Sequence, residues 1–343
     1  MNVIRSLPSR QLFWPVVTLV ALFVLNVAVS PSFLAVRVRD GHLFGSLIDI
    51  LRNGAPIILV ALGMTLVIAT RGIDLSVGAV VAISGALACT IIADSSDPNG
   101  LGTVLAACAV ALVFSLVLGA WNGLLVAVFG IQPIIATLIL MTAGRGIAML
   151  ITEGQIITIS SAPYKTIGAG YWFGLPASII IAAVMFALAA LLTRKTALGL
   201  LIEAVGINPE ASRLAGVRAR SIIWTVYVFS ALCAAIAGLI ISSNVTAADA
   251  NRAGLWIEMD AILAVVIGGT SLAGGRYSLT GTLIGAFIIQ TLTTTVYTIG
   301  IAAEITLVFK ALVVIAVCLL QSPVVRERMH ARRPTITRKV AAS

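Results

Sequence analysis

The sequence predicts an all-α integral membrane protein with about ten transmembrane helices, and two observations carry that prediction. First, 60% of its 343 residues are hydrophobic and only 10% are charged, with a mean hydropathy of +1.11, which lies outside the range of soluble globular domains. Second, residues 11–30, 55–70 and 101–130 contain no charged side chain. Because a helix needs roughly 20 apolar residues to cross about 30 Å of hydrocarbon, each region predicts most or all of a membrane helix.

Ten apolar segments follow one another along the chain. The first comes after a weakly basic start, Arg5 and Arg10, and is expected to remain as a span rather than to be cleaved as a signal peptide, because no exported globular domain follows it. The later segments are separated by polar or glycine-rich links, and several are short for a full span. The expected segments are residues 12–30, 46–70, 75–94, 101–129, 132–151, 177–193, 221–243, 257–273, 278–299 and 303–321.

The distribution of basic residues predicts the orientation in the membrane. With the N-terminus inside, most of the 22 Lys and Arg residues fall on the cytoplasmic side, in particular in the loop 194–220 and in the tail 322–343. Short cytoplasmic loops collect Lys and Arg, so both termini are expected in the cytoplasm. No loop is large enough for a separate catalytic domain, and the chain is expected to form one transmembrane domain, residues 1–343.

The same features exclude several classes of protein. Membrane topology accounts for the net charge of +9, so no nucleic-acid partner is expected. The chain has just two histidines, His42 and His330, so a histidine-based triad or a histidine-rich metal site cannot form within the membrane. It has no GxxxxGK[ST] motif for nucleotide. We expect no catalytic residue, metal or cofactor; if ATP drives the protein, another subunit binds it.

A weak internal likeness pairs VIATRGIDLSVGAVVAISGA (67–86) with VIGGTSLAGGRYSLTGTLIGA (266–286). Each is a glycine- and serine-rich link between two spans. The copies begin about five spans apart, so the second is expected to cross the membrane in the opposite sense, as in the inverted repeats of transporters. This predicts an inverted repeat that relates segments 2–5 to segments 7–10. Chance similarity between glycine-rich membrane segments is the alternative.

The stretch RGIDLSVG (71–78) places an acid and a base close to membrane depth. Arg71 and Asp74 lie three residues apart and could neutralise each other on one helical turn, and ionisable groups at this depth usually line a cavity or a pathway. Asp74 and Ser76 are therefore candidate residues of a gate or of the wall of a translocation path. The alternative is an ordinary cytoplasmic turn. The stretch TSLAGGR (270–276) has similar features in the second half of the chain.

Neutral hydrogen-bonding groups lie within later spans. Asn122 in the fourth segment and Thr137 in the fifth are two of them. Such groups suit a sugar, whose hydroxyls must exchange hydrogen-bond partners as the molecule crosses, so both are candidate path residues. Hydrogen bonding between helices explains them nearly as well.

Residues 203–217, EAVGINPEASRLAGV, form a charged stretch between two apolar runs. They contain the residues that begin and end a short helix, which are the N-cap Asn208, the first-position Pro209, the first-turn Glu210 and the stop Gly216. A helix of about two turns is predicted from Pro209 to Ala215, with Arg213 on its polar side. Alone, such a helix would be unstable in water. It is either a loop helix on the membrane surface or a docking element for a cytoplasmic partner.

Three stretches occur in order along the chain: GIDLSVG (72–78), EAVGINPEASRLAGV (203–217) and AILAVVIGGTSLAGG (261–275). Together they resemble the permease subunits of bacterial ABC importers of the ribose, xylose and galactose type. The likeness covers essentially the whole chain. Within that family, DGHLFGSLIDIL (40–51), LLTRKTALG (191–199) and ADANRAGLW (248–256) are most similar to the galactofuranose importers.

The resemblance implies the ABC importer permease fold, embedded in the lipid of the bacterial inner membrane. It also implies three partners: a cytoplasmic ATPase that binds the ATP, a periplasmic sugar-binding protein, and a second permease that is a paralogue rather than an identical copy. In this family the loop between spans six and seven receives the motion of the ATPase. The residues of this chain that would do so are Glu203, Gly206, Asn208, Pro209, Glu210, Arg213 and Gly216.

The predicted function is thus the permease subunit of an ATP-driven importer of a monosaccharide, galactofuranose or a galactose-like sugar, that works by alternating access. The alternative is a secondary sugar transporter driven by an ion gradient without an ATPase. That class would require carboxylates deep within the spans. Apart from Asp49 and Asp74, which lie near segment ends, most acidic residues here lie in loops.

Overall fold

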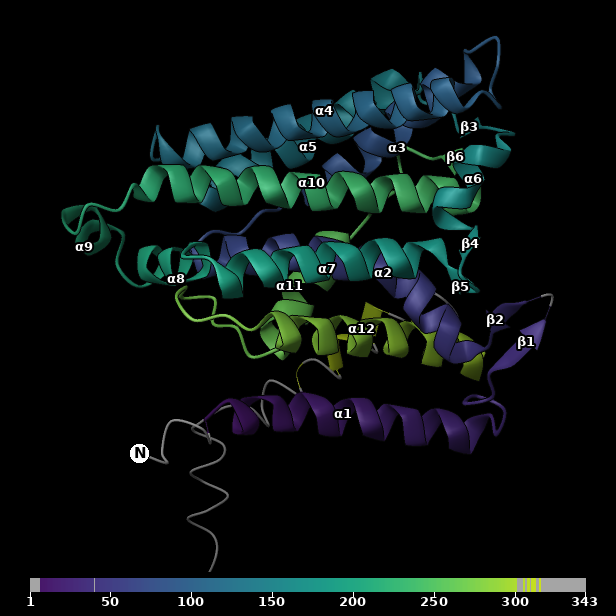
Figure 1. The fold of residues 1–343 in the computed structure, drawn as a ribbon, viewed down its shortest axis with the longest axis horizontal. Coiled ribbons are helices and arrows are strands. Elements are labelled where there is room, and N and C mark those ends of the chain that lie inside the picture. The colour runs from purple at the N-terminus through teal and green to yellow at the C-terminus, as the bar shows by residue number, and fades with distance from the viewer. Residues whose placement is uncertain are drawn as a thin grey trace, which may run out of the picture.

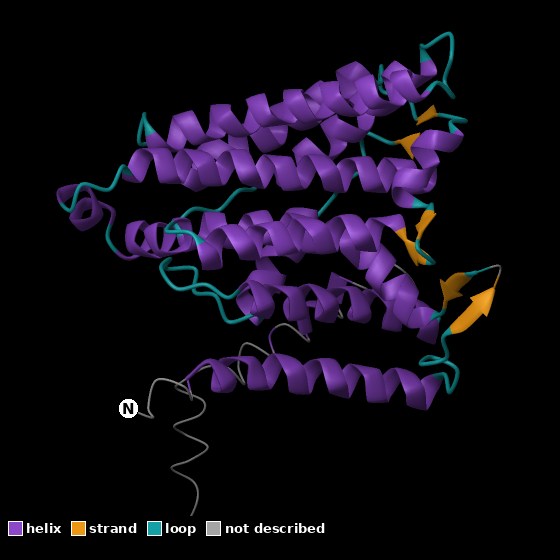
Figure 2. Cartoon of the chain, in the orientation of Figure 1, coloured by secondary structure: helices purple, strands orange, loops and turns teal. Residues whose placement is uncertain are grey.

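The computed structural model describes residues 7–39, 41–300, 305, 307–308, 310–312 and 315. Long helices lie side by side in a bundle, and the short strands gather at one end of it (Figure 1; Figure 2). We call the end with the strands the hairpin end, and the opposite end, from which the short helix α9 (Pro209–Leu214) projects, the α9 end. The prediction of an all-α membrane protein is confirmed.

The elements among the described residues are mostly helices. The helices are α1 (Leu7–Val29), α2 (Ser46–Ala69), α3 (Val77–Ala93), α4 (Leu101–Ala127), α5 (Pro133–Ile151), α6 (Ala162–Gly168), α7 (Ala177–Lys195), α8 (Leu198–Ile207), α9 (Pro209–Leu214), α10 (Ala219–Val245), α11 (Ile257–Ile267) and α12 (Leu279–Ile299). The strands form three antiparallel pairs: β1 (Arg37–Arg39) with β2 (His42–Phe44), β3 (Ile157–Thr158) with β6 (Ala247–Ala248), and β4 (Tyr171–Trp172) with β5 (Leu175–Pro176).

Seven of the described helices are long and apolar enough to cross a membrane: α1, α2, α4, α5, α7, α10 and α12. Helix α3, with 17 residues, is slightly shorter. The segment expected to span residues 257–273 differs more, because α11 has only 11 residues and extends about 16 Å, roughly half the hydrocarbon thickness. The tenth expected segment, 303–321, lies mostly outside the described residues, and the tail 322–343 lies outside them.

Helix α11 ends where the chain passes close to α12. A Cβ atom at Gly268 would lie 2.4 Å from the carbonyl carbon of Gly281, so the two backbones touch. Gly269 follows with φ +86°, a left-handed conformation that ends helices. The residues beyond it form a loop, 268–278, instead of the second half of a span. The predicted length of this span is therefore wrong.

Helix α2 forms the centre of the bundle. It is buried at every position from Gly54 to Ala69 and packs against α7, α10, α11 and α12. A helix that is apolar on all sides is typical of such a central position. Helix α1 lies at the edge and packs on α12, where Asn26 Nδ2 donates a hydrogen bond to Thr295 Oγ1 at 2.7 Å.

The directions of the helices bear on the predicted repeat. Helices α2 and α10 run in opposite directions, as do α4 and α12, which an inverted relation between segments 2–5 and 7–10 requires (Figure 1). The two stretches from which the repeat was inferred do not occupy equivalent positions in its two halves. Residues 67–86 lead into α3 and residues 266–286 into α12, and both helices run toward the hairpin end. The expectation that these two stretches cross in opposite senses is wrong.

After α10, residues 249–256 form turns that pass alongside α3. A Cβ atom at Gly78 of α3 would lie 2.7 Å from the carbonyl oxygen of Gly254. Arg145 of α5 donates from Nη1 to the carbonyls of Ala250 at 2.9 Å and Ala253 at 2.6 Å. Non-helical backbone at membrane depth needs polar partners from the protein, and Arg145 supplies them here.

Candidate functional site

Helix α9 forms as the sequence predicts and projects beyond the long helices (Figure 1). Asn208 Oδ1 accepts hydrogen bonds from the backbone N–H groups of Glu210 at 3.1 Å and Ala211 at 3.0 Å. These bonds satisfy two of the free N–H groups at the helix N-terminus. Pro209 occupies the first helical position. The helix ends one residue earlier than predicted, and Gly216 follows with φ +85°.

The surface of α9 combines charges with an exposed apolar side chain. Arg213 Nη2 and Glu210 Oε1 form an ion pair at 2.5 Å, with side chains 65% and 68% exposed. Hydrogen bonding from Arg213 lowers the pKa of Glu210. The apolar side chains of Ala211 and Leu214 are also exposed, Leu214 to 78%. Ser212 is the side chain that α9 buries against the rest of the chain.

Helix α8, which was not predicted, immediately precedes α9 along the chain. A Cβ atom at Gly206 would lie 1.8 Å from the carbonyl oxygen of Ala69 and 2.7 Å from the backbone nitrogen of Gly275. A glycine is needed for this close approach to the end of α2. Glu203, one turn earlier, is half-buried and lines a hollow of about 460 Å³ together with Tyr277, whose pKa is raised by burial.

Arg71 joins α8 to the loop 70–76, which follows α2. Its Nε donates to the carbonyl of Gly206 at 2.5 Å, and its Nη2 donates to the carbonyl of Ile207. The ion pair expected between Arg71 and Asp74 is not formed in the described chain, and that prediction is wrong. Residues 70–76 form a turn rather than a helix, so a spacing of three residues does not bring the two side chains together.

Asp74 lies at the centre of a buried polar network. Its Oδ1 accepts from the Ser76 backbone N–H at 3.1 Å and from Ser76 Oγ at 2.6 Å, and its Oδ2 accepts from Ser230 Oγ of α10 at 2.9 Å. Ser76 Oγ in turn accepts from Asn122 Nδ2 of α4 at 2.8 Å. Buried charge and buried polar groups require such partners. The network therefore ties the loop 70–76 to α4 and α10.

Thr137 of α5 adds a fourth attachment to the same loop. Its Oγ1 donates to the carbonyl of Ile73 at 3.1 Å and also lies 2.9 Å from the carbonyl of Pro133. The structure thus brings all four candidate path residues together around one loop. The exposed fractions are 2% for Asp74 and Ser76, 1% for Asn122 and 0% for Thr137. In this conformation these side chains hold the loop and face the protein interior.

Comparison with known proteins identifies the class of the chain. Residues 46–318 match the family described as the permease component of branched-chain amino acid transport systems. The chain belongs to this family. It is a multi-pass membrane permease and not an enzyme.

The permease is similar to named relatives over almost their whole length. It is 50% identical over 325 residues to the galactofuranose transporter permease of Escherichia coli, which covers 92% of each chain. It is 44% identical over 328 residues to the fructose import permease of Bifidobacterium longum, covering 94% of this chain and 90% of the relative. It is 36% identical over 312 residues to the ribose import permease of Escherichia coli, covering 89% and 92%. No solved structure matches.

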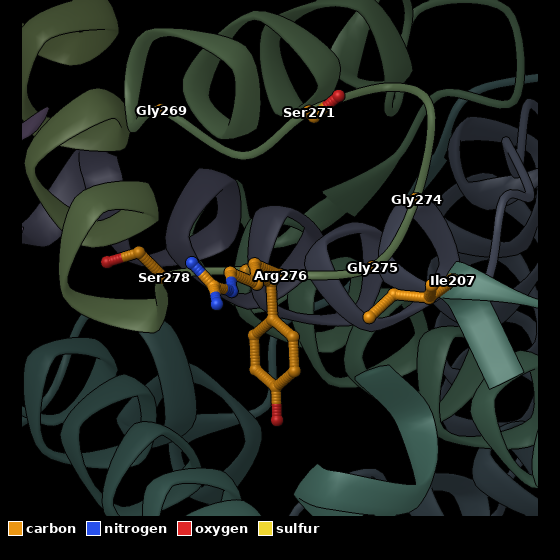
Figure 3. Close-up of a pocket in the computed structure, with 8 residues that line it drawn as sticks. Ile207, Gly269, Ser271, Gly274, Gly275, Arg276 and Ser278 are labelled. Atoms are coloured by element: carbon orange, nitrogen blue, oxygen red, sulfur yellow. The ribbon is translucent and has the colours of Figure 1, made fainter. Parts of the chain in front are cut away.

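A second hollow at the α9 end of the permease, of about 370 Å³, lies between α8 and the loop 268–278. Figure 3 shows the side chain of Ile207 directed toward Gly275, with Gly274 on the same loop. Tyr277 and Ser278 line both hollows, so the two are neighbours. Among the described residues, no three His, Cys, Asp or Glu side chains are grouped so that they could hold a metal ion.

Sequence reasoning missed several residues of this site in the permease. Ser230 is one of many hydroxyls in apolar helices, and 156 residues separate it from Asp74 along the chain. The contact of Arg71 with α8 joins residues 135 apart. No local pattern marks either contact. For Arg145, the signal was present: a lone arginine within an apolar span requires a partner at membrane depth.

Proposed function

We propose that the chain is the permease subunit of an ATP-binding-cassette importer that moves a monosaccharide, galactofuranose or a related sugar, across the bacterial inner membrane by alternating access. The observation that carries this proposal is the capped helix α9, which projects from the bundle with Leu214 exposed. An isolated helix of this length is unstable, so its exposed face suits a docking partner. The names of the relatives, permeases for galactofuranose, fructose and ribose, support a sugar as the substrate.

The proposed orientation places the α9 end in the cytoplasm and the hairpin end in the periplasm, with both termini cytoplasmic. The basic residues of the loop 194–220 and of the tail 322–343 support it. A cytoplasmic ATPase docks on the loop 194–220, and a periplasmic sugar-binding protein docks at the hairpin end. A second permease, a paralogue rather than a copy, completes the pathway. The whole chain, 1–343, acts as one permease domain surrounded by lipid.

Coupling would proceed from α9 toward the centre of the bundle. The residues proposed to receive the ATPase motion are Glu203, Gly206, Asn208, Pro209, Glu210, Arg213 and Gly216. Asn208 and Pro209 fix the helix start, and the pair Glu210 and Arg213 presents charge to the partner. Gly206 lets α8 contact the end of α2 directly, so that a displacement of α9 is passed on to the membrane helices.

The translocation gate is proposed to lie at the loop 70–76. Asp74, Ser76, Asn122 and Thr137 hold this loop through hydrogen bonds that reach α4, α5 and α10. If these hydrogen bonds exchanged partners between two arrangements, the loop 70–76 would open the translocation path in one arrangement and close it in the other. Buried networks with discrete arrangements suit such a switch.

The test is affinity purification of the tagged chain from native membranes, followed by identification of the attached subunits. We expect an ABC ATPase and a second, different permease. The double variant Arg213→Glu with Leu214→Asp should lose the ATPase and keep the second permease, whereas the control Lys165→Glu, at an exposed position of α6 outside the loop 194–220, should keep both. Sugar uptake by the lone chain in liposomes under an ion gradient would contradict the proposal and favour a secondary transporter.

A further inference from the structure

Three segments that are distant in sequence meet around Arg71 at the α9 end. The end of α8 contributes the carbonyls of Gly206 and Ile207, both of which accept hydrogen bonds from the guanidinium. The loop between α11 and α12 contributes Gly275, whose N–H donates to the carbonyl of Ala69 at 2.9 Å. Because Ala69 ends α2 two residues before Arg71, all three segments are joined within a few residues.

The backbone and side chain of Arg71 are both held in place at this junction. A Cβ atom at Gly274 would lie 2.3 Å from Arg71 Cγ and 3.1 Å from the carbonyl oxygen of Gly206, so the glycine is in contact with both. Arg71 itself has φ +65°. A residue other than glycine is uncommon in this left-handed conformation and persists where its surroundings determine it. Arg71 is thus fixed in one geometry.

The two carbonyls that Arg71 binds belong to the last residues of α8. Carbonyls at a helix C-terminus have no partner within the helix, and a guanidinium both satisfies them and complements the negative end of the helix. Helix α8 ends at Ile207 and α9 begins at Pro209, so Asn208 alone separates them. A displacement of α9 would therefore act on the Arg71 bonds through one residue.

On its other side, Arg71 leads directly into the buried polar network. Ile73, two residues on, accepts a hydrogen bond from Thr137, and Asp74 accepts from Ser76 and Ser230. The loop is thus fastened to the helix bundle at Ile73 and Asp74, and to α8 at Arg71. A movement of the α8 end must either carry this loop with it or break the Arg71 bonds.

We propose that Arg71 is a positioning residue for transport, which transmits the movement of α9 to the loop 70–76 by holding the end of α8 against it. The inference rests on the proposed function, because an ATPase must move α9. An arginine suits this role because its planar guanidinium presents several donors in a fixed fork, here to two successive carbonyls. A lysine retains the charge but presents one compact ammonium, so it should transmit the movement less well.

The test uses the complex with its co-purified subunits, reconstituted in lipid, and measures hydrogen–deuterium exchange with and without trapping by ATP and vanadate. In the wild type, trapping should change exchange both in the α9 peptide and in the peptide covering residues 70–78. In Arg71→Ala, the α9 response should persist and the response of residues 70–78 should fall several-fold. Arg71→Lys should give an intermediate response. Arg276→Ala is the matched control, because Arg276 is an exposed arginine of the neighbouring loop, and it should behave as wild type.

The outcomes separate this inference from the proposed function. If no ATPase accompanies the wild-type chain, or if trapping leaves α9 unchanged, the proposed function itself fails. If α9 responds and residues 70–78 respond equally in Arg71→Ala and the wild type, the role of Arg71 is overturned. If Arg71→Ala does not assemble, Arg71→Lys decides: a response reduced relative to Arg276→Ala supports the inference, and an unreduced one refutes it.

Discussion

Asp74 fastens the loop 70–76 because its two carboxylate oxygens accept hydrogen bonds from separate parts of the chain. Asp74→Ala would leave the hydroxyls of Ser76 and Ser230 without this acceptor in the protein interior. Hydrogen bonds to charged groups contribute about 1.5–3 kcal/mol each, so we expect a clear fall in the thermal unfolding midpoint of the purified permease. Asp97→Ala, at an exposed loop position, should leave the midpoint unchanged. Equal midpoints for the two variants would contradict the role given to Asp74.

The sequence identified the side chains of this network better than it identified their partners. Asp74 and Ser76 were found from a motif, because acids near membrane depth are rare enough to be informative. Arg71 was paired with Asp74 by their spacing, but spacing predicts contacts only within a regular element, and residues 70–76 are a turn. The true partners, Gly206 and Ile207, offer backbone carbonyls, which any residue carries. Their residue types therefore gave no signal.

The start of α9 depends on the cap at Asn208. Asn208→Ala removes both hydrogen bonds to the first-turn N–H groups, at a typical cost of about 1 kcal/mol. That energy corresponds to roughly fivefold faster amide exchange in the α9 peptide, measurable by hydrogen–deuterium exchange. The matched control is Asn208→Asp, which keeps an acceptor oxygen and should exchange at nearly the wild-type rate. Similar exchange in both variants would show that the cap does not stabilise α9.

The seating of α8 on α2 depends on the missing side chain at Gly206. Gly206→Ala would place a methyl group 1.8 Å from the carbonyl oxygen of Ala69, so α8 must move away. Overpacking of this kind typically costs about 1–3 kcal/mol, and we expect a lower unfolding midpoint with weaker retention of the ATPase. Gly146→Ala in α5 is the matched control, because a Cβ there meets no atom within 4 Å. If the two variants behave alike, the close approach of α8 is not required.

At α8 and α11 the structure differs from the sequence prediction for one reason. Hydropathy identifies an apolar run but not the residue at which its helix ends, and both of these helices end at contacts with distant segments. Helix α11 ends where Gly268 touches the backbone of Gly281. Helix α8, 10 residues long, is too short for a span and therefore went unnoticed beside the charged α9. In contrast, the cap residues of α9 are local signals, and its start at Pro209 was predicted correctly.

Across the bundle, hydropathy predicted which segments enter the membrane but not their places within it. Helices α1 and α2 are both apolar, yet α1 lies at the edge while α2 is buried along most of its length. Helices α4 and α5 expose apolar side chains such as Val113, Val117 and Ile139. Since lipid is as apolar as a protein core, both environments select the same residues. Position is set by packing between helices, which a single sequence does not report.

The proposed orientation predicts opposite chemical accessibility for the two ends of the bundle. Phe173, between β4 and β5 at the hairpin end, is 100% exposed, and Leu214 on α9 is 78% exposed. In a background with the four native cysteines replaced, Phe173→Cys and Leu214→Cys would each offer one thiol. A membrane-impermeant maleimide added to intact spheroplasts should label the Phe173→Cys variant and spare Leu214→Cys, and inverted membrane vesicles should give the reverse. If Leu214→Cys is labelled from outside, α9 cannot meet a cytoplasmic ATPase. If both variants are labelled from one side, the bundle does not span the membrane between these two ends.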